Sequence, residues 1–347
     1  MTAQPENPVA IPALRRALFA WYSANRRDLP WRRGRDPYAI WVSEIMLQQT
    51  RVAVVVDRFQ AFMARFPTIV ALARASEQDV LALWSGLGYY RRARMLHKAA
   101  QLVASSMDGK LPAAAAELRT LPGIGAYTAA AIASIAHTEP VAVVDGNVER
   151  VLCRLAGWSA DGRHGVVLKR KIDALAAEIL DPDRPGDHNQ AMMELGATVC
   201  LPRNPQCLVC PLQPACKTRG EHKTAPRPPM RTREVAHALA LRTTPDGRRA
   251  VLLEQRSAAE TVMPGLWELP ALCPTVAAVG EPRMTLRHSI MQVNYSVRIH
   301  PVGEEALASM TIAGGQRRWV PLHEAGSMAL TGLARKVLSR LPEAGVS

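Results

Sequence analysis

The sequence predicts a protein of two domains, the first almost entirely helical and the second a mixture of helices and strands. The chain has 347 residues, which exceeds the usual size of a single hydrophobic core. Apolar residues recur at helical spacing through most of residues 1–216, whereas shorter segments typical of strands follow from about residue 235. We therefore expect a helical domain at 1–216, a linker at 217–234 and an α+β domain at 235–347.

Hydrophobic periodicity locates the helices of the first domain, and Pro and Gly residues separate them. The predicted helical segments are 11–22, 41–63, 77–84, 91–103, 113–118, 127–136, 148–155, 166–180 and 189–199. In the second domain, segments 237–242 and 250–255 flank the turn Pro245-Asp246-Gly247, a pattern typical of a β-hairpin. Further strands are predicted at 293–300 and 317–320, and a closing helix at 330–338.

The balance of charge indicates a polyanionic partner. Lys and Arg total 43 against 30 Asp and Glu, which gives a formal net charge of +13, and a surplus of this size is typical of nucleic-acid-binding proteins. A basic protein that is merely kept soluble by its charge is the alternative. The linker at 217–234 contains six basic residues, two acidic residues and three prolines. We expect it to be extended, because it has too little apolar surface to fold by itself.

Targeting and membrane segments are not expected. Arg15 and Arg16 interrupt the apolar run near the N-terminus, so this run does not resemble a signal peptide. Nowhere do roughly 18 apolar residues follow one another, so no membrane span is predicted. Six cysteines in a chain of this length do not indicate a secreted disulfide scaffold. We expect a monomer in the reducing cytoplasm, associated with the nucleoid.

Four of the cysteines form a cluster with metal-binding spacing. They follow the pattern C-x6-C-x2-C-x5-C with interleaved prolines, and they are Cys200, Cys207, Cys210 and Cys216. Such a loop has no helix or strand of its own, so we expect a metal to organise it. Four thiolates suit either zinc or a four-iron cluster. Unconnected buried thiols are the alternative, and the lone Cys153 and Cys273 are interpreted in that way.

A glycine-containing turn lies between two predicted helices at residues 121–128. Gly123 and Gly125 permit a tight turn with positive φ, and they leave backbone N–H groups free at the start of the next helix. Such N–H groups can bind one phosphate. An ordinary connection between helices is the alternative, because a G-x-G pattern alone is weakly specific.

Two carboxyl groups are candidates for chemistry, and each has a structural alternative. Asp145 precedes a predicted helix, where it can be an N-cap. The helix dipole also favours a negative charge there, and a carboxylate near DNA can stabilise a developing sugar cation. Glu44 lies in the apolar segment 40–47. In an apolar pocket its pKa would rise and it would suit a general acid, whereas on the polar face of a helix it would be solvated.

Several motifs occur together in this chain: WVSEIMLQQT at 41–50, WSGLGYYRRAR at 84–94, the glycine turn, Asp145-Gly146-Asn147 and the cysteine spacing. Together they resemble the MutY-type adenine DNA glycosylases of the helix-hairpin-helix superfamily. The resemblance covers residues 1–216. It implies a two-module helical domain with a helix-hairpin-helix and a [4Fe-4S] loop held by the four cysteines. The superfamily's G-x-D pattern is matched only in part, because Val143 stands at its glycine position.

The resemblance implies an enzyme that flips adenine out of double-stranded DNA, where adenine is mispaired with 8-oxoguanine or guanine, and hydrolyses its glycosidic bond. Glu44 would be the general acid, and Asp145 would stabilise or capture the sugar cation. Asn147 and Tyr127 would orient the two carboxyl groups and the water.

The resemblance also assigns groups that bind DNA. Gln49 and Tyr89 would enter the gap as wedges, with Tyr89 beside the lesion opposite the adenine. The glycine turn would hold a phosphate through its backbone. The adenine pocket would be lined by Arg32, Trp31 and Gln190. Core positions are the alternative for the aromatic residues.

Tyr127, the second residue after Gly125, implies a monofunctional enzyme. Enzymes that resemble endonuclease III carry a lysine at this position, and its amine forms a Schiff base with the sugar and cuts the strand. A tyrosine cannot form a Schiff base. The base should therefore be removed and the strand left intact.

The second domain resembles the Nudix-like C-terminal domain of the same family through MPGLWELP at 263–270. The long Glu-rich box that binds magnesium in Nudix hydrolases is absent from the sequence, so we predict no pyrophosphatase activity. The Phe-Ser-His loop of the family aligns with Ile290-Met291-Gln292 and is not matched. Arg287-His288-Ser289 lies beside it and is a candidate replacement.

Two other functions compete with this interpretation. A glycosylase for oxidised pyrimidines fits the helical domain, but neither Tyr127 nor the second domain favours it. A non-catalytic iron–sulfur protein that binds DNA or transfers electrons explains the charge and the cysteines. It does not explain Glu44 and Asp145 together.

Overall fold

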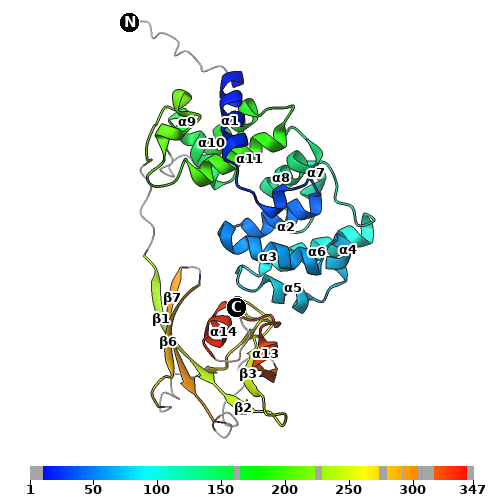
Figure 1. Ribbon diagram of the computed structural model, residues 1–347, viewed down its shortest axis with the longest axis vertical. Helices are drawn as coiled ribbons and strands as arrows, with labels where there is room; N and C mark the ends of the chain where they lie inside the picture. The colour runs from blue at the N-terminus through cyan, green and yellow to red at the C-terminus, as the bar shows by residue number, and fades with distance from the viewer. Residues whose placement is uncertain are drawn as a thin grey trace. The chain divides into compact units, whose positions relative to one another are not determined.

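The computed structural model describes residues 11–159, 165–222, 229–272, 280–290, 292–303, 306 and 316–341. The chain divides into two compact units, Met1–Ala73 with Lys98–Pro226 and Arg74–His97 with Arg227–Ser347. The first unit is helical and the second combines sheets with helices, which confirms the predicted fold class (Figure 1). Cys273 and Met291, named in the sequence analysis, lie outside the described residues.

Helices joined by short turns make up the first unit. They are α1 (Ile11–Asn25), α2 (Pro37–Leu47), α3 (Val52–Arg65), α4 (Ile69–Arg74), α7 (Ala115–Leu118), α8 (Ala126–His137), α9 (Gly146–Ala156), α10 (Gly165–Ile179) and α11 (Pro185–Thr198). Among the described residues, short 3-10 helices accompany them: η1 (Pro30–Arg32), η2 (Cys207–Val209) and η3 (Gln213–Ala215). Helix α6 (Arg91–Ser106) begins in the second unit and ends in the first.

One predicted helix is wrong, because the segment 41–63 is divided into α2 and α3. Gln49 has a φ of 59°, a left-handed conformation that a helix interior does not accommodate. Apolar residues continue at helical spacing beyond the turn, so periodicity alone does not reveal the break. The start of α2 is fixed by Asp36, whose carboxylate accepts hydrogen bonds from the backbone N–H groups of Tyr38 and Ala39.

Packing around α8 brings the elements of the site together. Most of α8 is buried, and its run of alanines lets α2 and α11 approach it closely. A further apolar cluster joins α1, α9, α10 and α11 and includes Leu18, Leu152, Ile172 and Leu195. Side chains from α2, α8, α9 and α11 are thereby held on one rigid frame.

In the residues that the structure describes, the second unit contains two sheets. Its strands are β1 (Arg231–Leu239), β2 (Leu241–Thr243), β3 (Arg249–Gln255), β4 (Trp267–Glu268), β5 (Ala271–Leu272), β6 (Met284–Ile290), β7 (Val293–Pro301) and β8 (Arg317–Pro321). One sheet has the order β5-β1-β7-β6, and the other has the order β2-β3-β4 with β8 paired to β3. Its helices include α5 (Glu77–Trp84), α13 (Leu322–Ala325) and α14 (Gly332–Leu338).

Helix α14 packs into the core between these sheets (Figure 1). One apolar cluster contains Leu253 of β3, Val297 of β7 and Val337 of α14. Strand β7 pairs in parallel with β1 and antiparallel with β6. The helix therefore contacts the apolar side chains of both sheets.

The predicted hairpin is present, because β2 and β3 pair antiparallel and Gly247 in the turn has a φ of 80°. The predicted strand 237–242 is divided between β1 and β2. Strand β1 begins at Arg231, within the segment predicted as a linker, and β6 was not predicted. Residues 74–97 belong to the second unit, although helical periodicity had grouped them with the first domain. The domain boundaries at 216 and 235 stay a prediction.

In the part of the chain that the structure describes, no helix combines the length and the apolar character that crossing a membrane requires.

Candidate active site

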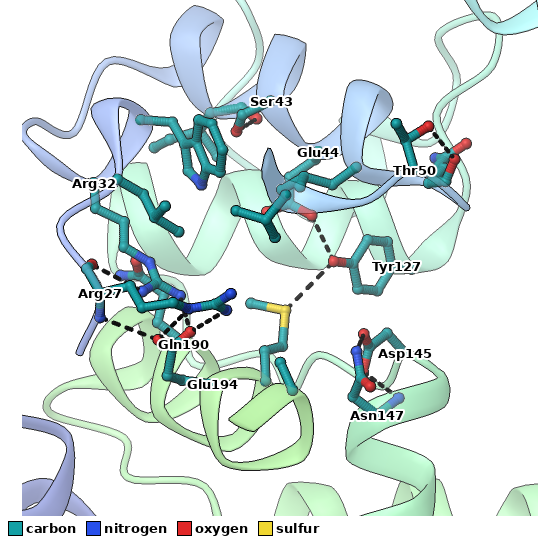
Figure 2. Close-up of a pocket in the computed structure, with 18 of the residues that line it drawn as sticks. Arg27, Arg32, Ser43, Glu44, Thr50, Tyr127, Asp145, Asn147, Gln190 and Glu194 are labelled. Atoms are coloured by element: carbon teal, nitrogen blue, oxygen red, sulfur yellow. Dashed lines mark hydrogen bonds and ion pairs between the residues drawn. The ribbon is translucent and has the colours of Figure 1, made fainter. Parts of the chain in front are cut away.

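A pocket of about 690 Å³ lies in the first unit and collects most of the predicted site residues (Figure 2). Its lining comes from η1, from α2 and the turn that follows it, and from α8, α9 and α11. The predicted residues that line it are Trp31, Arg32, Glu44, Gln49, Tyr127, Asp145, Asn147 and Gln190. Trp31 and Gln190, which are 159 positions apart in the sequence, thus meet in one cavity.

Glu44 is buried at this pocket, with 5% of its surface exposed. Its pKa is raised to about 7, chiefly by burial; the hydrogen bond from Tyr127 and the charge of Arg32 oppose the shift, and the negative charge of Asp145 contributes to it. The alternative of a solvated helix face is wrong. Periodicity could not decide this point, because α2 is buried on nearly all sides.

Tyr127 holds the Glu44 carboxyl in place from the first turn of α8. Its hydroxyl donates to Glu44 Oε2 (Figure 2), at a distance of 2.5 Å, and it lies 3.4 Å from Met193 Sδ. Burial raises the pKa of Tyr127 well above its usual value, and the charges of Glu44 and Asp145 raise it further. The phenol therefore stays neutral and acts as a hydrogen-bond donor that orients the carboxyl group.

Asp145 is both a helix cap and a pocket residue. Its Oδ1 accepts hydrogen bonds from the backbone N–H groups of Asn147 at 2.9 Å and Val148 at 2.7 Å. Its Oδ2 accepts from Asn147 Nδ2 at 2.9 Å. The structural interpretation as an N-cap is therefore confirmed, and the same carboxylate faces the pocket. These three donors fix the orientation of the carboxylate.

Asn147 is held by neighbours that the sequence analysis did not identify. Its Oδ1 accepts from Arg150 Nη2 at 2.9 Å, and Arg150 also donates to the carbonyls of Gly196 at 2.6 Å and Cys200 at 2.7 Å. A Cβ added at Gly196 would lie 2.6 Å from Asn147 Cβ. The absence of a side chain at residue 196 thus lets α11 approach Asn147 closely.

A buried carboxylate, Glu194, was also missed. Its side chain is 0% exposed and binds Arg27 through two hydrogen bonds of 2.7 Å and Arg32 through one of 2.8 Å. Burial would raise its pKa, but the bonds from Arg27 and Arg32 outweigh burial and lower the pKa to about 2. Glu194 lies one helical turn after Gln190, so the i, i+4 spacing on α11 was the available signal.

The other predicted residues differ in burial and in backbone conformation. Trp31 is mostly buried against Phe59 and also lines the pocket. Tyr89 belongs to the second unit, is 50% exposed and has a φ of 48°. In the glycine turn, Gly123 has a positive φ of 78°, but Gly125 has a φ of −87° and caps α8. The turn with positive φ is therefore present at Gly123, whereas Gly125 adopts the extended conformation of an N-cap.

The four cysteines of the predicted loop line one small cavity of about 30 Å³ together with Arg154. Burial raises the pKa of Cys210 to about 11, and the other three thiols contribute to the shift. Arg154 is 3% exposed and donates to Cys200 Sγ at 3.3 Å and to the carbonyl of Leu201 at 2.7 Å. Among the described residues, however, no group of three or more His, Cys, Asp or Glu is arranged to hold a metal ion. The lone Cys153 is buried, as predicted.

Known proteins match the part of the chain that forms this site. Residues 42–176 match the protein family described as HhH-GPD superfamily base excision DNA repair protein. Over 205 residues the chain is 47% identical to the adenine DNA glycosylase of Mycolicibacterium smegmatis, with 58% of this chain and 68% of that protein covered. The chain belongs to the adenine DNA glycosylase family. It is also 48% identical over 218 residues to the human adenine DNA glycosylase, with 60% of this chain and 40% of that protein covered.

This member of the adenine DNA glycosylase family spans less than half the length of several curated relatives, covering 40% of the human, 42% of the rat and 45% of the mouse protein. Among solved structures, a thermostable thymine-DNA glycosylase aligns with a TM-score of 0.55 and 26% identity, over 60% of this chain and 96% of that chain. A non-covalent endonuclease III–DNA complex aligns with a TM-score of 0.51 and 22% identity, over 61% and 97% of the respective chains, and shows the fold alone.

Proposed function

We propose that this protein hydrolyses the N-glycosidic bond of adenine that is mispaired with 8-oxoguanine or guanine in duplex DNA. The supporting observation is the pairing of two unlike carboxyl groups in one pocket. Glu44 has a pKa near 7, so it carries a proton at neutral pH in a large fraction of molecules. Asp145 accepts three hydrogen bonds, from the backbone N–H groups of Asn147 and Val148 and from the Asn147 side chain. An acid and an anion across one cavity suit the cleavage of a glycosidic bond.

The reaction begins when the adenine leaves the base stack and enters the pocket, since its glycosidic bond is out of reach within the duplex. Trp31, Arg32 and Gln190 line the cavity that receives it. Glu44 donates its proton to a ring nitrogen of adenine, so the C–N bond breaks with a neutral base as the leaving group. The electron pair of that bond stays with the adenine, and the sugar becomes an oxocarbenium-like cation.

Asp145 then stabilises the sugar cation by its charge or captures it covalently. Asn147 fixes Asp145 through the bond to Oδ2, and Tyr127 fixes Glu44. Water adds to the anomeric carbon and gives up a proton, for which the Glu44 carboxylate is the nearby acceptor. The products are free adenine and an abasic site, with Glu44 protonated again.

The strand stays intact in this proposal. Tyr127 is a neutral phenol hydrogen-bonded to Glu44, and a phenol forms no Schiff base with the sugar. Gln49 is a candidate wedge, since it lines the pocket in a left-handed conformation. We assign Tyr89 as the second wedge and the Gly123–Gly125 turn as a phosphate contact, and the net charge of +13 supports the affinity for DNA.

The duplex substrate provides the direct test of this function. We expect single-turnover release of adenine from duplexes with adenine opposite 8-oxoguanine or guanine, and an unbroken strand until alkali is added. A duplex with thymine glycol opposite adenine is the control, and no release of the damaged pyrimidine is expected. Excision of thymine glycol with strand cleavage would instead favour the pyrimidine glycosylase, and binding without any excision would favour the non-catalytic protein.

The loop Cys200–Cys216 is proposed to hold a [4Fe-4S] cluster through Cys200, Cys207, Cys210 and Cys216. All four thiols line one cavity, and the Arg154 guanidinium beside Cys200 would stabilise thiolate charge. The cluster would supply a structural crosslink that keeps the loop folded. Arg150 joins the loop to Asn147 through the Cys200 carbonyl, so the proposed role of the loop is to support the pocket.

The metal content of the purified protein tests this assignment. We expect a yellow-brown protein with about four iron atoms per chain, because four cysteine thiolates complete the coordination of one cluster. The measurements are iron and acid-labile sulfide per chain, with zinc determined on the same sample. A colourless, fully active protein that holds one zinc ion would contradict the cluster and favour the zinc alternative.

The pKa of Glu44 predicts how excision depends on pH. A general acid must be protonated, and the pKa of Glu44 is raised by burial to about 7. The single-turnover rate should therefore be constant below this pH and fall about tenfold for each pH unit above it, as the protonated fraction falls. DNA affinity measured over the same range is the control. A rate that stays constant or increases from about pH 6 to about pH 9 would exclude Glu44 as the acid.

A further inference from the structure

The exposed Tyr89 lies in a strained turn between two buried residues, Ser85 and Tyr90. Three of the four intervening residues have positive φ, with 96° at Gly86, 68° at Gly88 and 48° at Tyr89. A left-handed conformation is unfavourable for a tyrosine, and it persists only where surrounding contacts fix the backbone. The contacts that fix this turn therefore determine where the Tyr89 ring lies.

Both ends of the turn are attached to one carbonyl group of the C-terminal region. Ser85 Oγ donates to the Leu330 carbonyl at 3.1 Å, and Tyr90 Oη donates to the same oxygen at 2.9 Å. Arg335 Nε of α14 donates to Ser85 Oγ at 3.0 Å. Ser85, Tyr90 and Leu330 are all buried. The turn that carries Tyr89 is thus attached to the segment that leads into α14 and to α14 itself.

The same helix contacts β6, the strand that contains Arg287-His288-Ser289. A Cβ added at Gly332 would lie 3.3 Å from Cε1 of His288, so the imidazole packs against the start of α14. Lys336 Nζ donates to the Arg287 carbonyl at 2.7 Å. Helix α14 therefore contacts both candidate elements of lesion recognition, the Tyr89 turn and the His288 segment of β6.

The start of α14 is itself held firmly in the core. Thr331 caps the helix by accepting from the Ala334 N–H at 3.1 Å, and its hydroxyl donates to the buried Glu268 carboxyl. The Thr331 N–H donates to the Trp267 carbonyl at 2.9 Å, and the Trp267 N–H donates to the Ala329 carbonyl at 2.8 Å. The segment 329–331 is thereby joined to β4, so it provides a rigid support for the Tyr89 turn.

We propose that α14 with Leu330 is a platform that fixes the Tyr89 turn relative to the His288 segment of β6, so that the two read the base opposite the adenine together. The proposal rests on the proposed function, in which Tyr89 lies beside that base. A tyrosine whose backbone is fixed before binding loses little conformational freedom when it enters DNA. The platform residues themselves do not touch the DNA and act by positioning.

The test measures discrimination between opposite bases. Affinities are determined for duplexes with uncleavable 2′-fluoro-2′-deoxyadenosine opposite 8-oxoguanine or guanine. The double variant Ser85→Ala/Tyr90→Phe loses both hydrogen bonds to the Leu330 carbonyl. Each of these bonds contributes modestly to fixing the Tyr89 turn, so we expect the preference for 8-oxoguanine to fall about tenfold. Tyr38→Phe is the matched control, because the Tyr38 hydroxyl is also buried and also donates to a backbone carbonyl, that of Phe66 at 2.9 Å.

A second variant changes the contact between α14 and His288 and is expected to fold normally. Gly332→Ala adds a methyl group where His288 packs, whereas alanine favours the helix more than glycine does. We expect the preference for 8-oxoguanine to fall while the thermal unfolding temperature is maintained or rises. Unchanged preference in both Gly332→Ala and the double variant would overturn the platform.

Tyr89→Ala separates this inference from the function on which it rests. If Tyr89→Ala lowers the preference but the platform variants do not, only the platform is wrong. If Tyr89→Ala keeps the full preference, the role of Tyr89 in the proposed function is wrong and the platform fails with it.

Discussion

Glu44→Gln is expected to reduce single-turnover release of adenine by about 100- to 10,000-fold, the usual contribution of a general acid, with the duplex still bound. The amide has nearly the same shape as the carboxyl and can accept the hydrogen bond from Tyr127. It cannot donate an acid's proton to adenine. The pocket should therefore form as before while the base leaves only as a poor, anionic leaving group.

Glu254→Gln is the matched control for this change. The Glu254 side chain is 12% exposed and pairs with Arg317 in the second unit, so it provides a Glu→Gln change at another largely buried side chain, outside the pocket. Release should stay near that of the unchanged protein. If Glu44→Gln releases adenine at a near-normal rate, Glu44 is a structural residue and the acid must be sought elsewhere in the pocket.

Asp145→Asn is expected to reduce adenine release by roughly a hundredfold or more, because it removes a negative charge at the point where positive charge develops. The asparagine can still cap α9 through its Oδ1, so the two bonds from the Asn147 and Val148 N–H groups are kept. Its new amide group, however, meets Asn147 Nδ2, and two donors then face each other. We expect the lost hydrogen bond to lower the free energy of unfolding by about 1 kcal/mol.

Asp36→Asn separates capping from catalysis. Asp36 caps α2 in the same way, accepting from the N–H groups of Tyr38 and Ala39. Its replacement should affect unfolding by a similar or smaller amount and leave adenine release nearly unchanged. Adenine release and urea unfolding are measured for both variants. If both variants reduce adenine release by the same small amount, Asp145 is only a helix cap.

The sequence predicts individual helices well and their long-range partners poorly. Helical periodicity depends on neighbouring residues, so most helices of the first unit were predicted within a few residues. The ion pair of Arg27 with Glu194 joins residues 167 positions apart, and no local pattern indicates it. Strand β6 was missed for a related reason. Its segment 284–290 alternates apolar with charged or polar residues only weakly, and pairing with β7 determines its structure.

In the candidate site, too, features set by neighbouring residues could be predicted, whereas features set by distant residues could not. The N-cap role of Asp145 follows from its position before a helix, and the structure confirms it. The burial of Glu44 could not be derived from α2, which is apolar almost all round. The assignment of Glu44 as the general acid came from the resemblance to a glycosylase family. Residues 74–97 belong to the second unit, where Ser85 and Tyr90 donate hydrogen bonds to the Leu330 carbonyl, about 240 residues away in the sequence.

The close contact at Gly196 has a consequence for how variation in this chain would be interpreted. Residue 196 has no side chain that can touch a substrate, yet even a methyl group there would collide with Asn147 Cβ and the Asn147 backbone. The collision would displace the residue that orients Asp145. A survey of all single substitutions scored by activity would therefore group Gly196 with the carboxyl groups. Its intolerance would reflect the spacing of two helices and no chemistry of its own, so activity scores alone would misassign it as a reactive position.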